Sequence, residues 1–185
     1  SGKSTVAEVF KLLGVPVYDA DSRAKLLMTE DAALVAAIRE NFGQKAYSGG
    51  LLNRQYLAAR VFASEDETNR LNALVHPAVA RDFASWITGQ QTDYVVKEAA
   101  LLFETGSYKE LDKVILVTAP EELRIGRVQK RDPQRSPEQI RNIIGKQISV
   151  DRAQALADEI LANDGSKLLI PEIIRLDDKI KRAIR

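Results

Sequence analysis

The feature that most constrains the fold of this chain is the stretch SGKST at residues 1–5. Gly2, Lys3 and Ser4 match the last three fixed positions of the phosphate-binding loop G-x-x-x-x-G-K-[ST]. Apolar residues then recur at the spacing of one helix face, at Val6, Val9, Phe10 and Leu13. Such a loop joins a buried strand to a helix, so we expect a parallel α/β fold whose N-terminal strand and first half of the loop are missing from this sequence.

The tripeptide alone does not establish a nucleotide site. Average residue usage produces a Gly-Lys-Ser by chance in roughly one chain in ten of this length. A serine-glycine pair is also an ordinary start for a helix. The helix pattern after the motif and the strands predicted downstream favour the phosphate loop over this alternative.

Short apolar and β-branched runs predict buried strands at 15–18, 93–103, 113–120 and 158–164. Helical patterns run from about Glu121 to a loop bracketed by Pro133 and Pro137, and then from about 138 to 147. A C-terminal amphipathic helix is predicted to carry one apolar side, formed by Ile170, Ile173, Ile174, Ile180 and Ile184. This alternation of strands and helices predicts a parallel sheet with helical crossovers.

Residues 22–91 have an almost wholly helical pattern, which predicts a helical insertion. Ser64 and Glu67 have the spacing of a capping box at the start of one helix. His76 precedes Pro77, and a residue before proline is biased away from helical geometry, so an interruption is expected there. A later apolar stripe is interpreted as core, at Val79, Phe83 and Trp86.

Composition limits the classes of function. The chain has 185 residues, with 27 Lys and Arg against 26 Asp and Glu, so no overall charge attracts nucleic acid or a membrane surface. It has no cysteine and a single histidine, which argues against disulfides, thiol catalysis and histidine-based metal sites. No apolar run reaches the length of a membrane span. We therefore expect a cytoplasmic protein with no nucleic-acid or membrane partner; its oligomeric state is left open.

The predicted phosphate site assigns a role to each residue of the first stretch. Lys3 reaches the β- and γ-phosphates of ATP, the Ser4 hydroxyl ligates Mg²⁺, and the backbone amides around Gly2 hold the phosphates. Ser1 and Thr5 flank them and complete the nucleotide-binding set.

Two carboxylates, Asp19 and Asp21, follow the first predicted strand directly. They are expected at the same sheet edge as the phosphate loop, where they could hold Mg²⁺ through water or take a proton from an attacking hydroxyl. Aspartate is also common in turns and as a helix cap, and one of the two is expected to cap the helix that starts near Ser22. Position alone leaves both roles open.

Arginines recur on one predicted helix face at Arg124, Arg127 and Arg131, and Arg135 follows in the proline-bracketed loop. They form either a solvated face paired with Glu121 and Glu122, or a lid that closes over the phosphates. His76 is interpreted as a structural or substrate-lining residue rather than a general base, since helix breaks need polar groups.

Taken in order, these segments resemble the dephospho-coenzyme A kinase family over nearly the whole chain. The resemblance rests on SGKSTVAEVF, LGVPVYDADSRAKLL, LNRQYLAARVF, LNALVHPAV, EAALLFETGSYKELDKVILVTAPEELRIGRV, KRDPQRSPEQI, the pair Lys146 and Gln147, and ANDGS. It implies a P-loop kinase fold with a parallel core sheet flanked by helices, a helical substrate-binding insertion and a lid. The implied reaction transfers the γ-phosphoryl group of ATP, with Mg²⁺, to the ribose 3′-hydroxyl of dephospho-coenzyme A.

The resemblance implies a division into domains. The nucleotide-binding core is expected at 1–28 and 93–185, with a lid at about 131–147, and the helical acceptor-binding insertion at 29–92. Another small-molecule or nucleotide kinase of the same fold is the alternative. A GTP-dependent switch is disfavoured, because the sequence contains neither Asp-x-x-Gly nor Asn-Lys-x-Asp.

The resemblance also implies site roles. Asp21 becomes the favoured partner of the attacking hydroxyl, with Asp19 behind it, and Arg131 and Arg135 become the lid arginines.

Further residues are implied at the two substrates. Asn163 and Gly165 are expected to border the adenine, and Leu101 and Leu102 to line the acceptor pocket. The chain departs from many family members at Ala100, where they have proline.

Overall fold

The structure is a computed structural model that describes residues 1–145 and 147–184. The chain divides into two compact units. The core unit comprises Ser1–Val17 and Thr92–Arg185, and the helical unit comprises Tyr18–Gln91. The first boundary therefore lies after Val17, ahead of the boundary after residue 28 expected from the sequence.

The core unit begins with the predicted helix, α1 (Lys3–Leu12), which starts directly at the Gly-Lys-Ser and ends just before Gly14. Its buried face supplies Val6 and Phe10 to the main apolar core. The remaining buried members of that core come from the strands, the C-terminal helix and the turn after α1: Val15, Val117, Leu161, Ile173 and Leu176.

Two parallel strands carry this core, β5 (Ile115–Thr118) and β6 (Glu159–Ala162), with Ile115 opposite Glu159 and Thr118 opposite Ala162. A second pair joins β4 (Val96–Glu98) to β1 (Val17–Asp19), and at its start the Val96 N–H donates to the Pro16 carbonyl at 2.9 Å. Among residues 1–145 and 147–184, no strand joins the β5–β6 pair to the β1–β4 pair.

The predicted strand at 93–103 is largely wrong, because only Val96–Glu98 is extended. The apolar residues after it form turns, and a short 3-10 helix, η2 (Ser107–Glu110), follows. Backbone bonds within the turns, such as the Thr105 N–H to the Leu101 carbonyl at 3.0 Å, satisfy groups that a strand would have paired with a neighbour.

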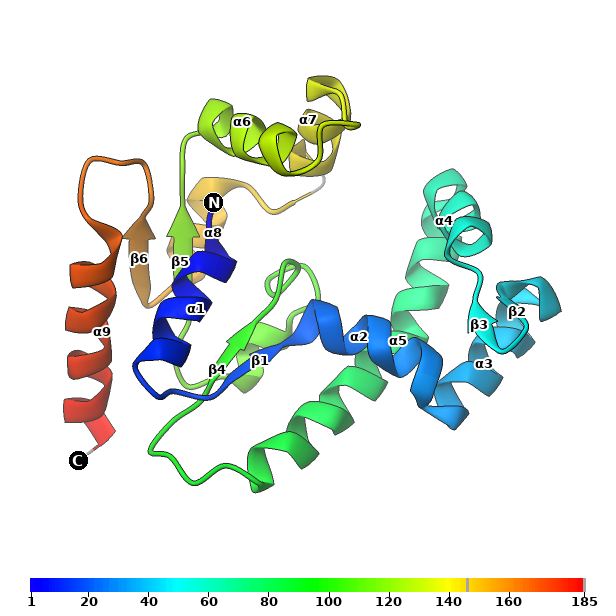
Figure 1. The fold of residues 1–185 in the computed structure, drawn as a ribbon, viewed down its shortest axis with the longest axis horizontal. Coiled ribbons are helices and arrows are strands. Elements are labelled where there is room, and N and C mark those ends of the chain that lie inside the picture. The colour runs from blue at the N-terminus through cyan, green and yellow to red at the C-terminus, as the bar shows by residue number, and fades with distance from the viewer. Residues whose placement is uncertain (146, 185) are drawn as a thin grey trace. The chain divides into compact units, whose positions relative to one another are not determined.

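Three helices lie between β5 and β6 in the chain: α6 (Glu121–Arg131), α7 (Pro137–Gly145) and α8 (Val150–Leu156) (Figure 1). The first two were predicted to within two residues, although Lys146 lies outside the described residues. The short helix α8 was missed; Ser149 caps it by accepting the Arg152 N–H at 3.4 Å.

The C-terminal helix, α9 (Leu169–Ile184), packs against α1 and β6 (Figure 1). The predicted apolar side is partly wrong: Ile173 is buried and Ile180 packs on the core, but Ile170, Ile174 and Ile184 are exposed. The buried side is centred on Leu176 and Asp177, which the apolar pattern did not include. The Asp177 carboxylate accepts bonds from the Tyr94 hydroxyl at 2.5 Å and from Lys181 Nζ at 2.8 Å, which compensates its burial.

The helical unit contains α2 (Ala20–Glu30), α3 (Ala32–Phe42), α4 (Arg54–Ala63) and α5 (Glu65–Thr88). A 3-10 turn, η1 (Gln44–Ala46), and a small hairpin of β2 (Tyr47–Ser48) and β3 (Leu51–Leu52) interrupt the helices. The hairpin was not predicted, although its two-glycine turn, at 49 and 50, is a recognised hairpin signal.

The predicted interruption at His76 and Pro77 is wrong, because α5 runs through both residues. Proline inside a helix costs about 3 kcal/mol through its missing N–H and ring clash. Val75, Ala78 and Val79 around it are buried, and this tertiary packing outweighs the local preference.

The capping-box prediction holds for the cap itself. Ser64 accepts the Glu67 N–H at 3.4 Å, at the start of α5. The second bond of a capping box, from the Ser64 N–H to the Glu67 carboxylate, is not formed. The Glu67 carboxylate accepts from Arg60 Nη2 at 3.0 Å instead.

None of the helices within the described residues is long and apolar enough to cross a membrane.

A half-buried polar network joins α2 to α5. Arg23 donates to both carboxylate oxygens of Asp82, at 2.8 and 2.5 Å, and the Tyr18 hydroxyl donates to the same carboxylate at 2.6 Å. The Tyr18 ring packs on Phe83 and Trp86, at centroid distances of 4.9 and 5.4 Å. Of the stripe predicted to be core, Val79 is buried, while Phe83 and Trp86 are half-buried. The Arg23 bonds, aided by Tyr18, lower the pKa of Asp82 against the opposing effect of burial.

We predict that Asp82→Asn destabilises the helical unit by about 1 to 2 kcal/mol at pH 7, because an amide cannot accept both Arg23 bonds. Folding lowers the pKa of Asp82, so its stabilising effect is present above the ordinary carboxyl pKa of about 4 and is lost as pH falls through the lowered value. Urea unfolding followed by Trp86, the only tryptophan, measures this from pH 7 to pH 3. A difference from the wild type that stays constant over this range would contradict the prediction.

Candidate functional site

The start of α1 is clamped by residues from two distant parts of the core unit. Asn163, which follows β6, donates its Nδ2 to the Ser1 carbonyl at 2.9 Å. Arg127 of α6 donates Nη1 to the same carbonyl and Nη2 to Asn163 Oδ1, both at 3.4 Å. These bonds fix the orientation of the loop that leads into α1. Together, the bonds of Asn163 and Arg127 to the Ser1 carbonyl are called the loop clamp below.

Gly2 is required at its position for two reasons. Its φ of 103° lies in the left-handed region, and a Cβ there would lie 2.2 Å from Asn163 Nδ2. The clamp therefore depends on the absence of a side chain at residue 2. The first N–H groups of α1 have no partner within the helix, and such groups bind phosphate at helix N-termini.

The loop lies in a strongly positive environment. Four cations, those of Lys3, Arg124, Arg127 and Arg131, lie close enough to act electrostatically on Ser1. Positive charges gathered at one place favour an anion there, and the positive end of the α1 dipole adds to the effect.

The hydroxyl of Ser4 donates to Glu98 Oε1 at 2.8 Å. Glu98 is the last residue of β4, so the end of this strand brings a carboxylate to the first turn of α1. The sequence reasoning missed Glu98, although an acid placed along a predicted buried strand was a usable signal. Thr5 is exposed beside Ser4.

The Ser4 and Glu98 oxygens suit Mg²⁺, which prefers hard oxygen ligands and commonly uses one or two protein groups together with substrate phosphates and water. A fuller protein cage is not seen: the described residues contain no group of three or more His, Cys, Asp or Glu placed to hold a metal ion.

The predicted arginine face divides into different environments. Arg127 belongs to the loop clamp rather than to a solvated face. The Arg124 side chain is only 19% exposed and lies 4.0 Å from Glu121, one of the pairings expected from the sequence. Arg131 is the last residue of α6, and Arg135 lies beyond it, where its Nε donates to Asp132 Oδ2 at 2.7 Å.

The remaining candidates of the core unit lie on loops. Asn163 is part of the clamp, and Gly165 follows in a turn with a φ of 87°. Leu101 and Leu102 lie in the turns after β4, where Leu101 is exposed and Leu102 is half-buried.

Asp19, Asp21 and His76 belong to the helical unit. The Asp19 carboxylate caps α2 by accepting the Ser22 N–H at 3.0 Å and the Ser22 hydroxyl at 2.6 Å. Burial raises the pKa of Asp19, but the Ser22 bonds and nearby backbone bonds together lower it below its usual value. Asp19 is thus the expected cap, while Asp21 is the exposed second residue of the helix.

His76 is half-buried in the middle of α5. Burial lowers the pKa of His76, so the side chain is neutral at pH 7. A role in satisfying a broken helix is excluded, because the helix is continuous there.

The sequence matches a known family over most of its length. A family model for dephospho-CoA kinase matches residues 1–168. A dephospho-CoA kinase from Porphyromonas gingivalis is 34% identical over 181 residues, which are 98% of this chain and 90% of the relative. One from Bacteroides fragilis is 36% identical over 177 residues, covering 95% of this chain and 86% of the relative.

Solved structures share the fold. A crystal structure of TT1252 from Thermus thermophilus matches with a TM-score of 0.81 and 30% identity, covering 100% of this chain and 92% of the other. A dephospho-CoA kinase from Campylobacter jejuni matches with a TM-score of 0.72 and 26% identity, covering 100% and 94%. The predicted α/β fold of the P-loop kinase class is confirmed.

We predict that Gly2→Ala weakens ATP binding by on the order of tenfold, because a Cβ displaces Asn163 and strains the left-handed turn. Gly14→Ala at the other end of α1 is the matched control, since Gly14 has a φ of 81° but open space around it. Both variants should lose about 1 kcal/mol of stability, and only the first should lose affinity in a calorimetric ATP titration. Equal ATP affinity in the two variants would refute the role of the clamp.

Proposed function

The chain belongs to the dephospho-CoA kinase family, and on this premise we propose that it phosphorylates the ribose 3′-hydroxyl of dephospho-coenzyme A with ATP to give coenzyme A. The observation that carries the proposal is the phosphate loop at α1, with its four nearby cations and the Ser4–Glu98 pair. This arrangement supports phosphoryl transfer from a nucleoside triphosphate, and the family supplies the acceptor.

In the proposed mechanism the loop positions ATP. The N–H groups around Gly2 and the Lys3 ammonium bind the β- and γ-phosphates, while Ser1 and Thr5 flank them. Arg127 and Asn163 keep the loop in its binding conformation through the Ser1 carbonyl. Phosphoryl transfer requires mainly positioning and charge stabilisation, which these groups provide.

Ser4 and Glu98 are proposed to hold Mg²⁺. When bound with ATP, Mg²⁺ neutralises charge on the phosphate oxygens. In other P-loop enzymes an acid at the end of a strand helps to hold Mg²⁺, and Glu98 is proposed to have this role here. Its bond to Ser4 orients the serine hydroxyl.

Five residues are proposed to act on the acceptor, and three of them, Asp19, Asp21 and His76, belong to the helical unit. Asp21 orients or deprotonates the 3′-hydroxyl, and Asp19 supports the turn that presents it by capping α2. His76, Leu101 and Leu102 are proposed to contact dephospho-coenzyme A. A neutral His76 suits a lining role, because it can form hydrogen bonds without adding charge.

Residues from about 131 to 147 are proposed to act as a lid. Arg131 and Arg135 then neutralise negative charge that develops during transfer. Arg135 is held by Asp132 in the described structure, so this role requires Arg135 to exchange Asp132 for phosphate. Asn163 and Gly165 are proposed to border the adenine.

We further propose that the enzyme works in the cytoplasm, with ATP and dephospho-coenzyme A as its partners. The absence of cysteine is compatible with a reducing compartment. No nucleic-acid partner is proposed, because 27 basic residues are balanced by 26 acidic ones.

Acceptor choice distinguishes this function from that of another small-molecule kinase of the same fold. ADP release is measured with dephospho-coenzyme A, nucleoside monophosphates and pantetheine derivatives as acceptors, and the product is identified by mass. Phosphorylation of dephospho-coenzyme A at its 3′-position supports the proposal. Turnover with another acceptor but not with dephospho-coenzyme A would overturn it.

We predict that Asp21→Asn lowers kcat by at least about a hundredfold while ATP affinity changes little, because the variant loses a carboxylate at the hydroxyl and not at the phosphates. Asp66→Asn is the matched control, since Asp66 is the exposed second residue of α5 as Asp21 is of α2. Steady-state rates and ATP titrations of both variants test this. Wild-type kcat in the Asp21 variant would refute the assignment.

We also predict that Glu98→Gln lowers the rate on the order of tenfold and raises the Mg²⁺ concentration needed for half-maximal rate. The amide oxygen can still accept the Ser4 bond, so this variant removes charge rather than the hydrogen bond. Glu8→Gln, an exposed acid on α1 paired with Lys11, is the control. Initial rates over a Mg²⁺ series should separate the two variants, and an unchanged Mg²⁺ requirement would contradict the prediction.

A further inference from the structure

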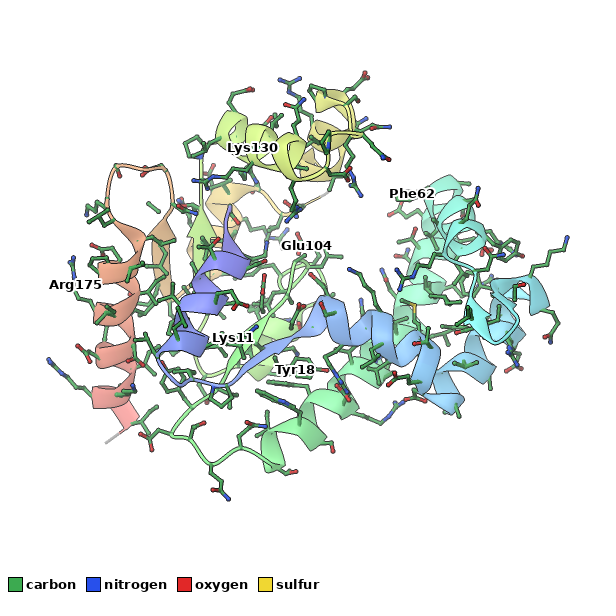
Figure 2. The ribbon with its side chains drawn as sticks, in the orientation of Figure 1. Lys11, Tyr18, Phe62, Glu104, Lys130 and Arg175 are labelled. Atoms are coloured by element: carbon green, nitrogen blue, oxygen red, sulfur yellow. The ribbon has the colours of Figure 1, made fainter. Side chains whose placement is uncertain are left out.

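The loop after β4 makes a contact that the proposed mechanism does not use. Glu104 lies in this loop (Figure 2), and its Oε1 accepts the backbone N–H of Ile148 at 2.8 Å. The two residues are 44 positions apart, and both belong to the core unit. Glu104 is exposed, so its carboxylate does not need this bond to compensate for burial. The bond instead holds the segment around Ile148 in one position.

Ile148 lies in the short connection between α7 and α8. On one side, the Gln147 N–H donates to the Ile144 carbonyl at 3.0 Å; on the other, Ser149 caps α8. Ile148 lies outside both helices, so Glu104 supplies the acceptor that a helix would otherwise provide. The bond holds the point at which the proposed lid returns to the rest of the core unit.

The loop that carries Glu104 is braced by its own bonds. The Gly106 N–H donates to the Phe103 carbonyl at 3.1 Å, and the Thr105 and Ser107 hydroxyls lie 2.9 Å apart. The rings of Phe103 and Tyr108 pack at a centroid distance of 5.5 Å. These contacts brace the loop around Glu104, and the chain leads into this loop from β4, the strand that ends at Glu98 and contacts Ser4.

Within the described residues, the main packing partner of α7 is α6. Ile140 is buried where α7 packs on α6, and Arg141 forms an exposed ion pair with Glu122 at 3.4 Å. An exposed pair of this kind contributes little to stability. The packing can hold α7 to α6, but it does not fix the far end of the lid to the strand that carries Glu98.

We propose that Glu104 is a positioning residue, which fixes the C-terminal end of the lid relative to the Ser4–Glu98 pair by accepting the Ile148 N–H. The inference rests on the proposed phosphoryl transfer and its lid. Glu104 acts as a hydrogen-bond acceptor and not through its charge, so glutamine can replace it and alanine cannot. Placement of the lid matters for charge that develops in the transition state, and much less for binding of ATP in the ground state.

The test compares Glu104→Ala, Glu104→Gln and a nearby control, Glu110→Ala in η2, in the full chain. Hydrogen exchange at the Ile148 amide should accelerate on the order of fivefold in the alanine variant and stay within about twofold of the wild type in the other two. With dephospho-coenzyme A and ATP, kcat should fall on the order of fivefold to tenfold in the alanine variant alone. ATP affinity without acceptor should be unchanged in all three.

Each contrary result overturns the inference. Unchanged exchange in Glu104→Ala would show that the bond does not hold the segment, and unchanged kcat would show that its position does not matter for transfer. Loss of kcat in Glu104→Gln equal to that in Glu104→Ala would assign the effect to charge. Exchange at the amides of β5 and β6 reports whether a variant has simply unfolded. A wild-type protein that does not phosphorylate dephospho-coenzyme A would defeat the proposed function, whereas the exchange comparison tests the Glu104 bond independently of activity.

Discussion

The structure around the proposed nucleotide site depends on one backbone conformation, the left-handed turn at Gly2. At this turn the Asn163 side chain approaches closely enough to donate to the Ser1 carbonyl. Arg127 then joins the clamp from α6. A side chain at residue 2 would meet Asn163, so the clamp and the proposed phosphate loop share one requirement, which is the absence of a Cβ.

The core unit brings three kinds of chemistry to this turn from parts of the chain far apart in sequence. Cations on α6 create a positive potential, the end of β6 supplies the amide of Asn163, and the end of β4 supplies the Glu98 carboxylate. Parallel α/β folds place ligands at the carboxyl ends of strands because helix N-termini and strand ends meet there. The loop after Glu98 makes a further contact of this kind, because Glu104 accepts the Ile148 N–H. Ile148 lies where the proposed lid rejoins the rest of the core unit.

Much of the site could be predicted from local signals. The Gly-Lys-Ser motif predicted the start of α1, and the acid pair after the first strand predicted a capped helix, with Asp19 as the cap. Glu98 and Arg127 were not assigned their contacts, because hydrogen bonds across 94 and 126 positions leave no periodic trace in sequence. The break expected at Pro77 was wrong for a related reason: burial of neighbouring residues outweighed a local backbone preference.

The sequence by itself determined the fold class, the order of most helices and strands, the start of α1 at Gly-Lys-Ser and the family, because these depend on periodicity and on motifs of adjacent residues. Only the tertiary structure decided which side chains meet. It ended the strand after Glu98, turned α9 so that Asp177 faces Tyr94, and joined Glu104 to Ile148. Such contacts are selected by the packing of distant segments and the need to satisfy their polar groups, which no local pattern records.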